Sequence, residues 1–78
     1  MTTRSFPVVL EWDEAARLWV TYVPALNFLS TDGTTREEAL ANTQEAILGY
    51  LEAASKEGLE VPGGNPMTEL VSVEVQAA

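Results

Sequence analysis

The chain has 78 residues and a formal net charge of −8, from 12 acidic and 4 basic side chains. It contains neither cysteine nor histidine, which excludes disulfides, thiol nucleophiles, thiolate metal sites and imidazole general bases. The length predicts a single domain, residues 1–78, with a thin core, and the charge disfavours contact with nucleic-acid phosphates and favours a basic protein partner.

Targeting and membrane signals are not visible in the sequence. Every apolar run is only a few residues long, far short of the roughly 20 residues that a membrane-spanning helix needs. The N-terminal residues 1–12 do not show the basic region, long apolar run and small-residue cleavage site of a signal peptide. We therefore expect a cytoplasmic protein that makes no membrane contact.

The first part of the sequence predicts three strands. Residues 5–13 alternate apolar and mostly polar side chains, with the period of a strand that buries one face. Residues 18–23, LWVTYV, are rich in aromatic and β-branched side chains and complete a predicted hairpin, which Pro24 ends. A short third strand is predicted over residues 27–31, before an Asp-Gly turn at residues 32–33.

A long amphipathic helix is the clearest predicted element. Residues 35–38, TREE, have the spacing of a capping box, in which Thr35 accepts from the backbone N–H of Glu38 and the glutamate reaches back to the threonine N–H. Gly58 is typical of the position just after a helix. The side expected to face the sheet spans an arc of roughly 140° and carries Ala39, Leu40, Thr43, Ala46, Ile47, Tyr50, Leu51 and Ala54. Because acidic residues already occupy the positive end of the helix dipole, we interpret residues 33–47 as a helix start and not as an anion site.

The order of elements predicts an α+β fold. Two prolines and two glycines within residues 59–69 predict a loop, and the alternation in residues 70–75, LVSVEV, predicts a final strand. Short links make the first three strands an antiparallel meander, while the helix allows a crossover to a parallel strand beside the first. We therefore expect β-β-β-α-β, as one mixed four-stranded sheet in the order 3-2-1-4 with the long helix on one face.

A single helix leaves the second face of such a sheet without a cover. Alternation places Trp19 and Val23 on the face opposite the even-numbered residues of strand 18–23. We expect a second copy of the chain to cover the exposed face, in a dimer or tetramer. Trp12 and Trp19 are expected on different faces, and the sequence leaves open whether each belongs to the core or to an interface.

Acidic side chains form two further candidate groups. Glu38, Glu45 and Glu52 recur at heptad spacing on the outer side of the helix, where they fit a basic partner, although a charged helix face is usually just solvated. The candidate partner or oligomer surface thus comprises Trp19, Val23, Glu45 and Glu52. Glu11, Asp13 and Asp32 near strand ends suggest a divalent-metal set of the RNase H type, but solvated surface charge is the favoured interpretation. We expect no catalytic residue, no metal site and no cofactor.

Residues 19–62, WVTYVPALNFLSTDGTTREEALANTQEAILGYLEAASKEGLEVP, resemble the HicB-like antitoxin family. The matching positions are Pro24, Leu26, Gly33, Thr35, Glu38, Ala39 and Pro62. Three departures stand out: Ala25 replaces the usual Asp, Asn27-Phe28-Leu29 replaces Pro-Gly-Cys, and Thr34 replaces the Asp before the capping threonine. Because Phe does not tolerate a positive φ as Gly does, Phe28 predicts a chain that bends differently there.

The resemblance implies a partial RNase H-like domain that neutralises a small basic toxin of the HicA type, an mRNA-cleaving ribonuclease with a catalytic histidine. The antitoxin acts by occlusion and is not itself catalytic. Many members carry an additional C-terminal DNA-binding module; the sequence ends directly after the predicted final strand, so we expect neither that module nor operator binding. Two alternatives remain: an orphan oligomeric scaffold of the same fold without a toxin, and, less favoured, a metal-dependent nuclease.

Overall fold

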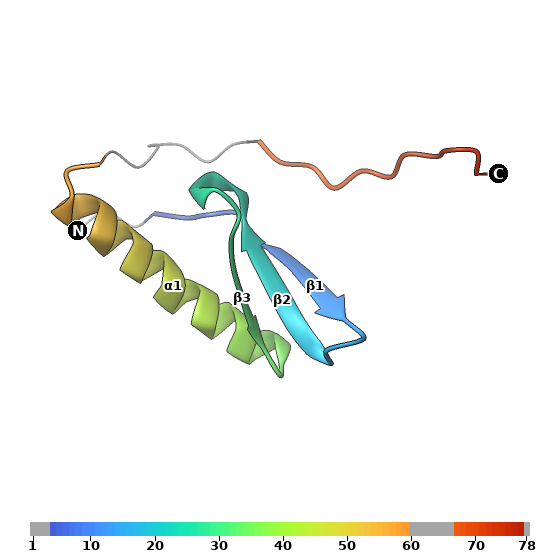
Figure 1. The fold of residues 1–78 in the computed structure, drawn as a ribbon, viewed down its shortest axis with the longest axis horizontal. Helices are drawn as coiled ribbons and strands as arrows, with labels where there is room; N and C mark the ends of the chain where they lie inside the picture. The colour runs from blue at the N-terminus through green and yellow to red at the C-terminus, as the bar shows by residue number, and fades with distance from the viewer. Residues whose placement is uncertain (1–3, 60–66, 78) are drawn as a thin grey trace.

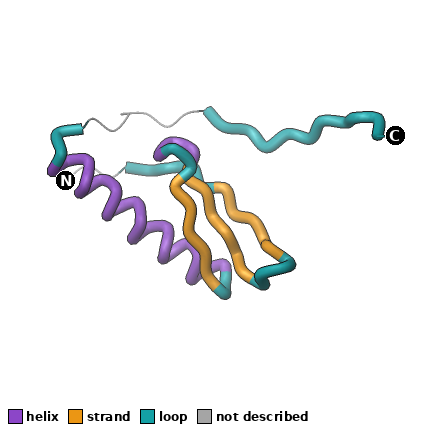
Figure 2. Tube along the Cα trace, viewed as in Figure 1, coloured by secondary structure: helices purple, strands orange, loops and turns teal. Residues whose placement is uncertain are grey.

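The computed structural model describes residues 4–59 and 67–77 of the chain (Figure 1). Its elements are β1 (Val9–Asp13), β2 (Leu18–Val23), the 3-10 turn η1 (Pro24–Leu26), β3 (Leu29–Gly33) and α1 (Arg36–Lys56). The strands form an antiparallel sheet in the order β1-β2-β3. Helix α1 packs on β3 and β2, on one face of the sheet (Figures 1 and 2). Over residues 4–59 and 67–77, the fold is therefore one helix on a three-stranded meander.

The expected four-stranded mixed sheet in the order 3-2-1-4 is wrong. Residues 70–75 belong to the segment 67–77, which carries no regular secondary structure and runs outside the sheet (Figure 2). Its apolar side chains are exposed: Leu70 by 95%, Val71 by 67%, Val73 by 79% and Val75 by 81%. Alternation specifies which side of a segment is apolar but supplies no neighbouring strand, so the pattern alone did not determine the pairing. Pro62 and most of the predicted loop lie outside the described residues.

The predicted hairpin is confirmed, and its loop determines its register. The backbone N–H of Arg17 donates to the carbonyl of Asp13 at 2.8 Å, and Arg17 takes a positive φ of 59°. Asp13 Oδ1 also accepts from the backbone N–H of Ala16 at 3.1 Å. A left-handed residue that ends a short loop matches the twist of a hairpin. Asp13 therefore lies opposite Leu18, and Trp12 opposite Trp19.

A buried pair of hydroxyls joins the sheet to the helix. Thr21 Oγ1 and Thr43 Oγ1 are 2.5 Å apart, and the two residues are 0% and 2% exposed. Thr43 Oγ1 also donates to the carbonyl of Ala39 at 2.7 Å, and Thr21 Oγ1 to the carbonyl of Thr31 at 3.3 Å, so either hydroxyl can be the donor in the bond between them. Since alternate residues of a strand share a face, Trp19, Thr21 and Val23 all lie on the α1 side of β2.

The faces of β2 are therefore the reverse of the expected arrangement. The structure places Val23 in the core, 0% exposed, and leaves the face with Leu18, Val20 and Tyr22 uncovered by α1. The expectation that Trp12 and Trp19 lie on different faces is also wrong, because directly opposed residues of an antiparallel pair share a face. The sequence pattern predicted that the more apolar side of β2 packs against the helix. In the structure the side that carries Thr21 packs against it, through the hydroxyl of Thr43.

The start of α1 lies unusually close to β3. A Cβ on Gly33 would overlap the backbone nitrogen of Ala39, so only glycine fits. Thr35 Oγ1 accepts from the N–H of Glu38 at 3.0 Å, as the capping box predicts. The Glu38 carboxylate accepts from the N–H of Thr34 at 3.0 Å, one residue earlier than expected. Asn42 Nδ2 donates to the carbonyl of Asp32 at 2.8 Å and so adds a second bond between helix and strand.

The other boundaries agree with the sequence to within a few residues. Strand β2 and the end of α1 before Gly58, which has a φ of 70°, are confirmed. Strand β1 begins at Val9 and not at residue 5, and β3 takes in the predicted turn residues 32–33. Within the described residues, no helix has the length and apolar character needed to cross a membrane.

The link between β2 and β3 contradicts the expectation for Phe28. Asn27 and Phe28 have φ values of 57° and 60°, and the N–H of Phe28 donates to the carbonyl of Val23 at 3.1 Å. The chain therefore makes a left-handed bend here without a glycine, at a cost of about 1–2 kcal/mol for a residue with a Cβ. Burial of Leu26 at 2% exposure fixes the preceding turn and holds this conformation in place.

Replacing Thr43 by Val should lower the free energy of unfolding by about 1 kcal/mol, because the hydroxyl bond to Thr21 is lost without a change of shape. The double variant T21V/T43V should lose less than the sum of the two single changes, since either single change already breaks the bond between the hydroxyls and the sum counts that loss twice. Urea unfolding followed by far-UV circular dichroism measures all three variants. Strictly additive losses would show that the two hydroxyls do not interact.

Phe28→Gly should be more stable than Phe28→Ala by about 1 kcal/mol, because only glycine relieves the left-handed strain. Both variants remove the ring, which is 65% exposed and contributes little to the core. The alanine variant is therefore the matched control for loss of the side chain. Equal thermal midpoints for the two variants would contradict a positive φ at this position.

Candidate binding surface on the open face of the sheet

The sheet face opposite α1 combines apolar and acidic side chains. We call this surface the open face; by strand alternation and register it carries Val9, Glu11, Asp13, Leu18, Val20, Tyr22, Ser30 and Asp32. Its central strand supplies the half-buried Leu18, Val20 and Tyr22, whereas Glu11 and Asp32 on the flanking strands are exposed. The surface is therefore an apolar strip with carboxylates along both sides.

The register explains how these acids come together. Val20 pairs with Glu11 of β1 on one side and with Asp32 of β3 on the other. Neighbouring strands lie about 4.8 Å apart, so the two acidic residues flank Val20 at a backbone separation of about 10 Å. Asp13, two residues after Glu11, shares their face. The three carboxylates that the sequence singled out as strand-end neighbours thus belong to one surface, although they come from both edges of the sheet.

These carboxylates do not form a metal centre. Across residues 4–59 and 67–77, no group of three or more acidic, histidine or cysteine side chains has the geometry to hold an ion. Asp13 instead accepts from the backbone of its own hairpin loop. The arrangement offers distributed negative charge beside apolar side chains, which is the chemistry of a protein contact and not that of a coordination site.

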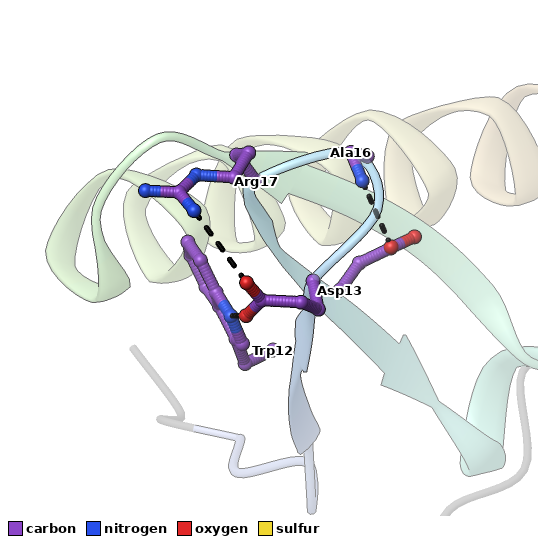
Figure 3. A network of polar contacts seen from close by, with 5 residues as sticks. Trp12, Asp13, Ala16 and Arg17 are labelled. Atoms are coloured by element: carbon purple, nitrogen blue, oxygen red, sulfur yellow. Dashed lines mark hydrogen bonds and ion pairs between the residues drawn. The ribbon is translucent and has the colours of Figure 1, made fainter.

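The hairpin loop lies at one end of this sheet and holds an aromatic pair. The indole N–H of Trp12 donates to the Glu14 carboxylate at 2.6 Å, and Arg17 approaches the other oxygen of that carboxylate at 3.5 Å (Figure 3). The rings of Trp12 and Trp19 meet edge to face, with centroids 5.4 Å apart. Since the Arg17 and Glu14 side chains are 75% and 77% exposed, their ion pair contributes little stability by itself. The Glu14 carboxylate is thus used to position Trp12.

The remaining candidates from the sequence occupy structural positions. Gly33, Thr35, Glu38 and Ala39 form the junction between β3 and α1, Pro24 begins η1, and Leu26 and Val23 are buried. Trp19 is half-buried against Trp12. Glu45 and Glu52 are exposed on α1, away from the open face. The predicted partner surface of Trp19, Val23, Glu45 and Glu52 is therefore spread over the core, the tryptophan pair and the helix exterior.

Sequence reasoning missed the open face because it assigned the wrong side of β2 to the helix. One signal was present in the sequence. A hairpin loop of residues 14–17 pairs residue 13 with residue 18 and therefore residue 11 with residue 20, so the loop length alone places Glu11 beside Val20. The side covered by α1 could not be read in this way, because it depends on contacts between Thr21 and the helix.

Comparison with known proteins identifies an informative relative. No protein-family model matches the chain, and no solved structure matches it. The chain is 38% identical over 60 residues to the UPF0150 protein Ta0767 of Thermoplasma acidophilum, an alignment that covers 77% of this chain and 86% of the relative. Identity at this level over most of both chains shows common membership, and the chain belongs to the UPF0150 family.

Proposed function

We propose that this protein is a non-catalytic, antitoxin-like subunit that binds and neutralises a small basic toxin of the HicA type. Membership of the UPF0150 family and the resemblance of residues 19–62 to HicB-like antitoxins support this assignment. The structural observation that carries it is the open face, where carboxylates flank an apolar strip on a chain of net charge −8. Such a surface complements a basic protein in both charge and apolar contact.

The open face supports this role better than the acidic side of the helix does. On the open face, Glu11 and Asp32 lie on either side of the half-buried Val20, so a partner would desolvate apolar atoms and approach two carboxylates together. Buried apolar contact at the centre of an interface with charge at its rim is the usual anatomy of specific association. Glu45 and Glu52 add long-range attraction, which speeds encounter but does not select the partner.

Charge reversal at the open face should weaken partner binding strongly. The variant E11K/D32K should weaken binding to a small basic toxin of the HicA type by about a hundredfold, because two attractive contacts become repulsive. The control E45K/E52K changes the net charge by the same amount on the helix exterior and should weaken binding far less. Calorimetry of the co-purified pair, and relief of toxin growth arrest on co-expression, measure the effect.

Equal losses in the two variants would assign the attraction to net charge alone and overturn the choice of the open face. Failure of the unaltered chain to relieve the growth arrest would overturn the antitoxin assignment itself. Far-UV circular dichroism of each variant confirms that the fold is retained, which we expect because Glu11, Asp32 and Glu45 are exposed and Glu52 lies on the helix exterior.

A further inference from the structure

The outer edge of β1 is open. In the described residues β1 pairs with β2 alone, so every second N–H and C=O of Val9–Asp13 points away from the sheet without a ladder partner. An unpaired edge of this kind is a ready template for another strand. β1 spans about 17 Å at the usual rise per residue, which is enough for a strand of ordinary length.

The C-terminal segment has the pattern of the strand that this edge lacks. Val71, Val73 and Val75 alternate with Leu70, Ser72 and Glu74, and residues 70–75 would span about 20 Å as a strand. Yet the segment lies outside the sheet, with its apolar side chains largely exposed (Figure 1). It also extends the molecule: the Cα radius of gyration is 15.0 Å, against roughly 11.5 Å for a compact chain of this length.

An apolar groove lies between α1 and residues 4–8, which lead into β1. It measures about 340 Å³ and lies between Phe6 and Val8, which precede β1, and Leu40, Ile47, Leu48 and Leu51 of α1. Arg4 covers the ring of Phe6 at 5.2 Å and borders the groove. A strand added to β1 would direct alternate side chains to this side of the sheet. The side chains of its three valines would then lie on the same side of the sheet as the groove.

We infer that residues 70–75 of one copy pair with the β1 edge of a second copy, in a reciprocal strand exchange. Each chain carries both halves of the contact, an open edge with an apolar groove and an exposed apolar segment, so a closed two-fold arrangement uses both. In the structure the segment of one chain extends away from its own sheet, which places it within reach of another. The exchange leaves the open face accessible, so it is separate from the proposed toxin contact.

The exchange depends on the apolar side chains of Val71, Val73 and Val75 and not on the opposite side of residues 70–75. Sedimentation or light scattering of the full chain at high micromolar concentration should give twice the chain mass of 8.5 kDa. Val73→Lys should halve that mass, because it places a charge on the apolar side. Ser72→Lys, whose side chain points to the opposite side of the added strand, beside Glu11, should leave the mass unchanged. Because both side chains lie outside the core, both variants should keep their far-UV circular dichroism. A monomeric parent chain, or equal masses for the two variants, overturns the inference.

Crosslinking distinguishes exchange between chains from pairing within one chain. The protein has no cysteine, so Glu11→Cys and Ser72→Cys each introduce a single thiol. In the exchanged pair both side chains lie on the open-face side of adjacent strands. A flexible bis-maleimide added to a mixture of the two variants should therefore give a covalent dimer containing one chain of each. Ser30→Cys, at the opposite sheet edge, is the control and should not link to Ser72→Cys.

The double variant E11C/S72C carries both thiols on one chain and is crosslinked at high dilution and at high concentration. If the crosslink forms only within one chain at both concentrations, the exchange is overturned and the segment belongs to its own sheet. Equal linkage from the Ser30→Cys control also overturns it, because a random collision would then explain the product.

Discussion

The bond between the hydroxyls of Thr21 and Thr43 determines which face of the sheet packs against α1. It lies in the contact between β2 and α1, with both side chains buried. Because a strand presents alternate residues to opposite sides, one buried contact at Thr21 fixes the side of every residue in β2 and, through the ladder, in β1 and β3. The position of the acidic open face, the burial of Val23 and the common side of the two tryptophans all follow from it.

A second constraint sets the distance between the layers. Gly33 lets the backbone of α1 approach β3 more closely than any side chain would permit. Thr35 and Glu38 then use their side chains to satisfy the first N–H groups of the helix and those just before it. The start of α1, which the sequence first offered as a candidate anion site, therefore performs a structural task. The fold relies on it because, among the described residues, the buried apolar core consists of few and mostly small side chains.

The local elements could be predicted from the sequence, but the way they pack could not. The capping residues and Gly58 indicated the helix, and alternation with a polar loop indicated the hairpin, because these signals act between residues close in the chain. The prediction of a final strand failed because its pairing is a long-range contact that alternation does not encode. The prediction for Phe28 failed because the surrounding turn holds it at a positive φ that its own preference opposes. The candidate surface was missed for the related reason that Thr21, a polar residue, faces the helix.

The tryptophan pair has a consequence for how the protein can be observed. Both tryptophans of the chain lie at the hairpin end, edge to face, and one of them donates to the Glu14 carboxylate. The two indoles therefore act as a single optical probe of the hairpin. Opening of this hairpin would separate the rings and free the indole N–H. The intrinsic fluorescence of the protein thus reports a local event, the integrity of the β1–β2 loop.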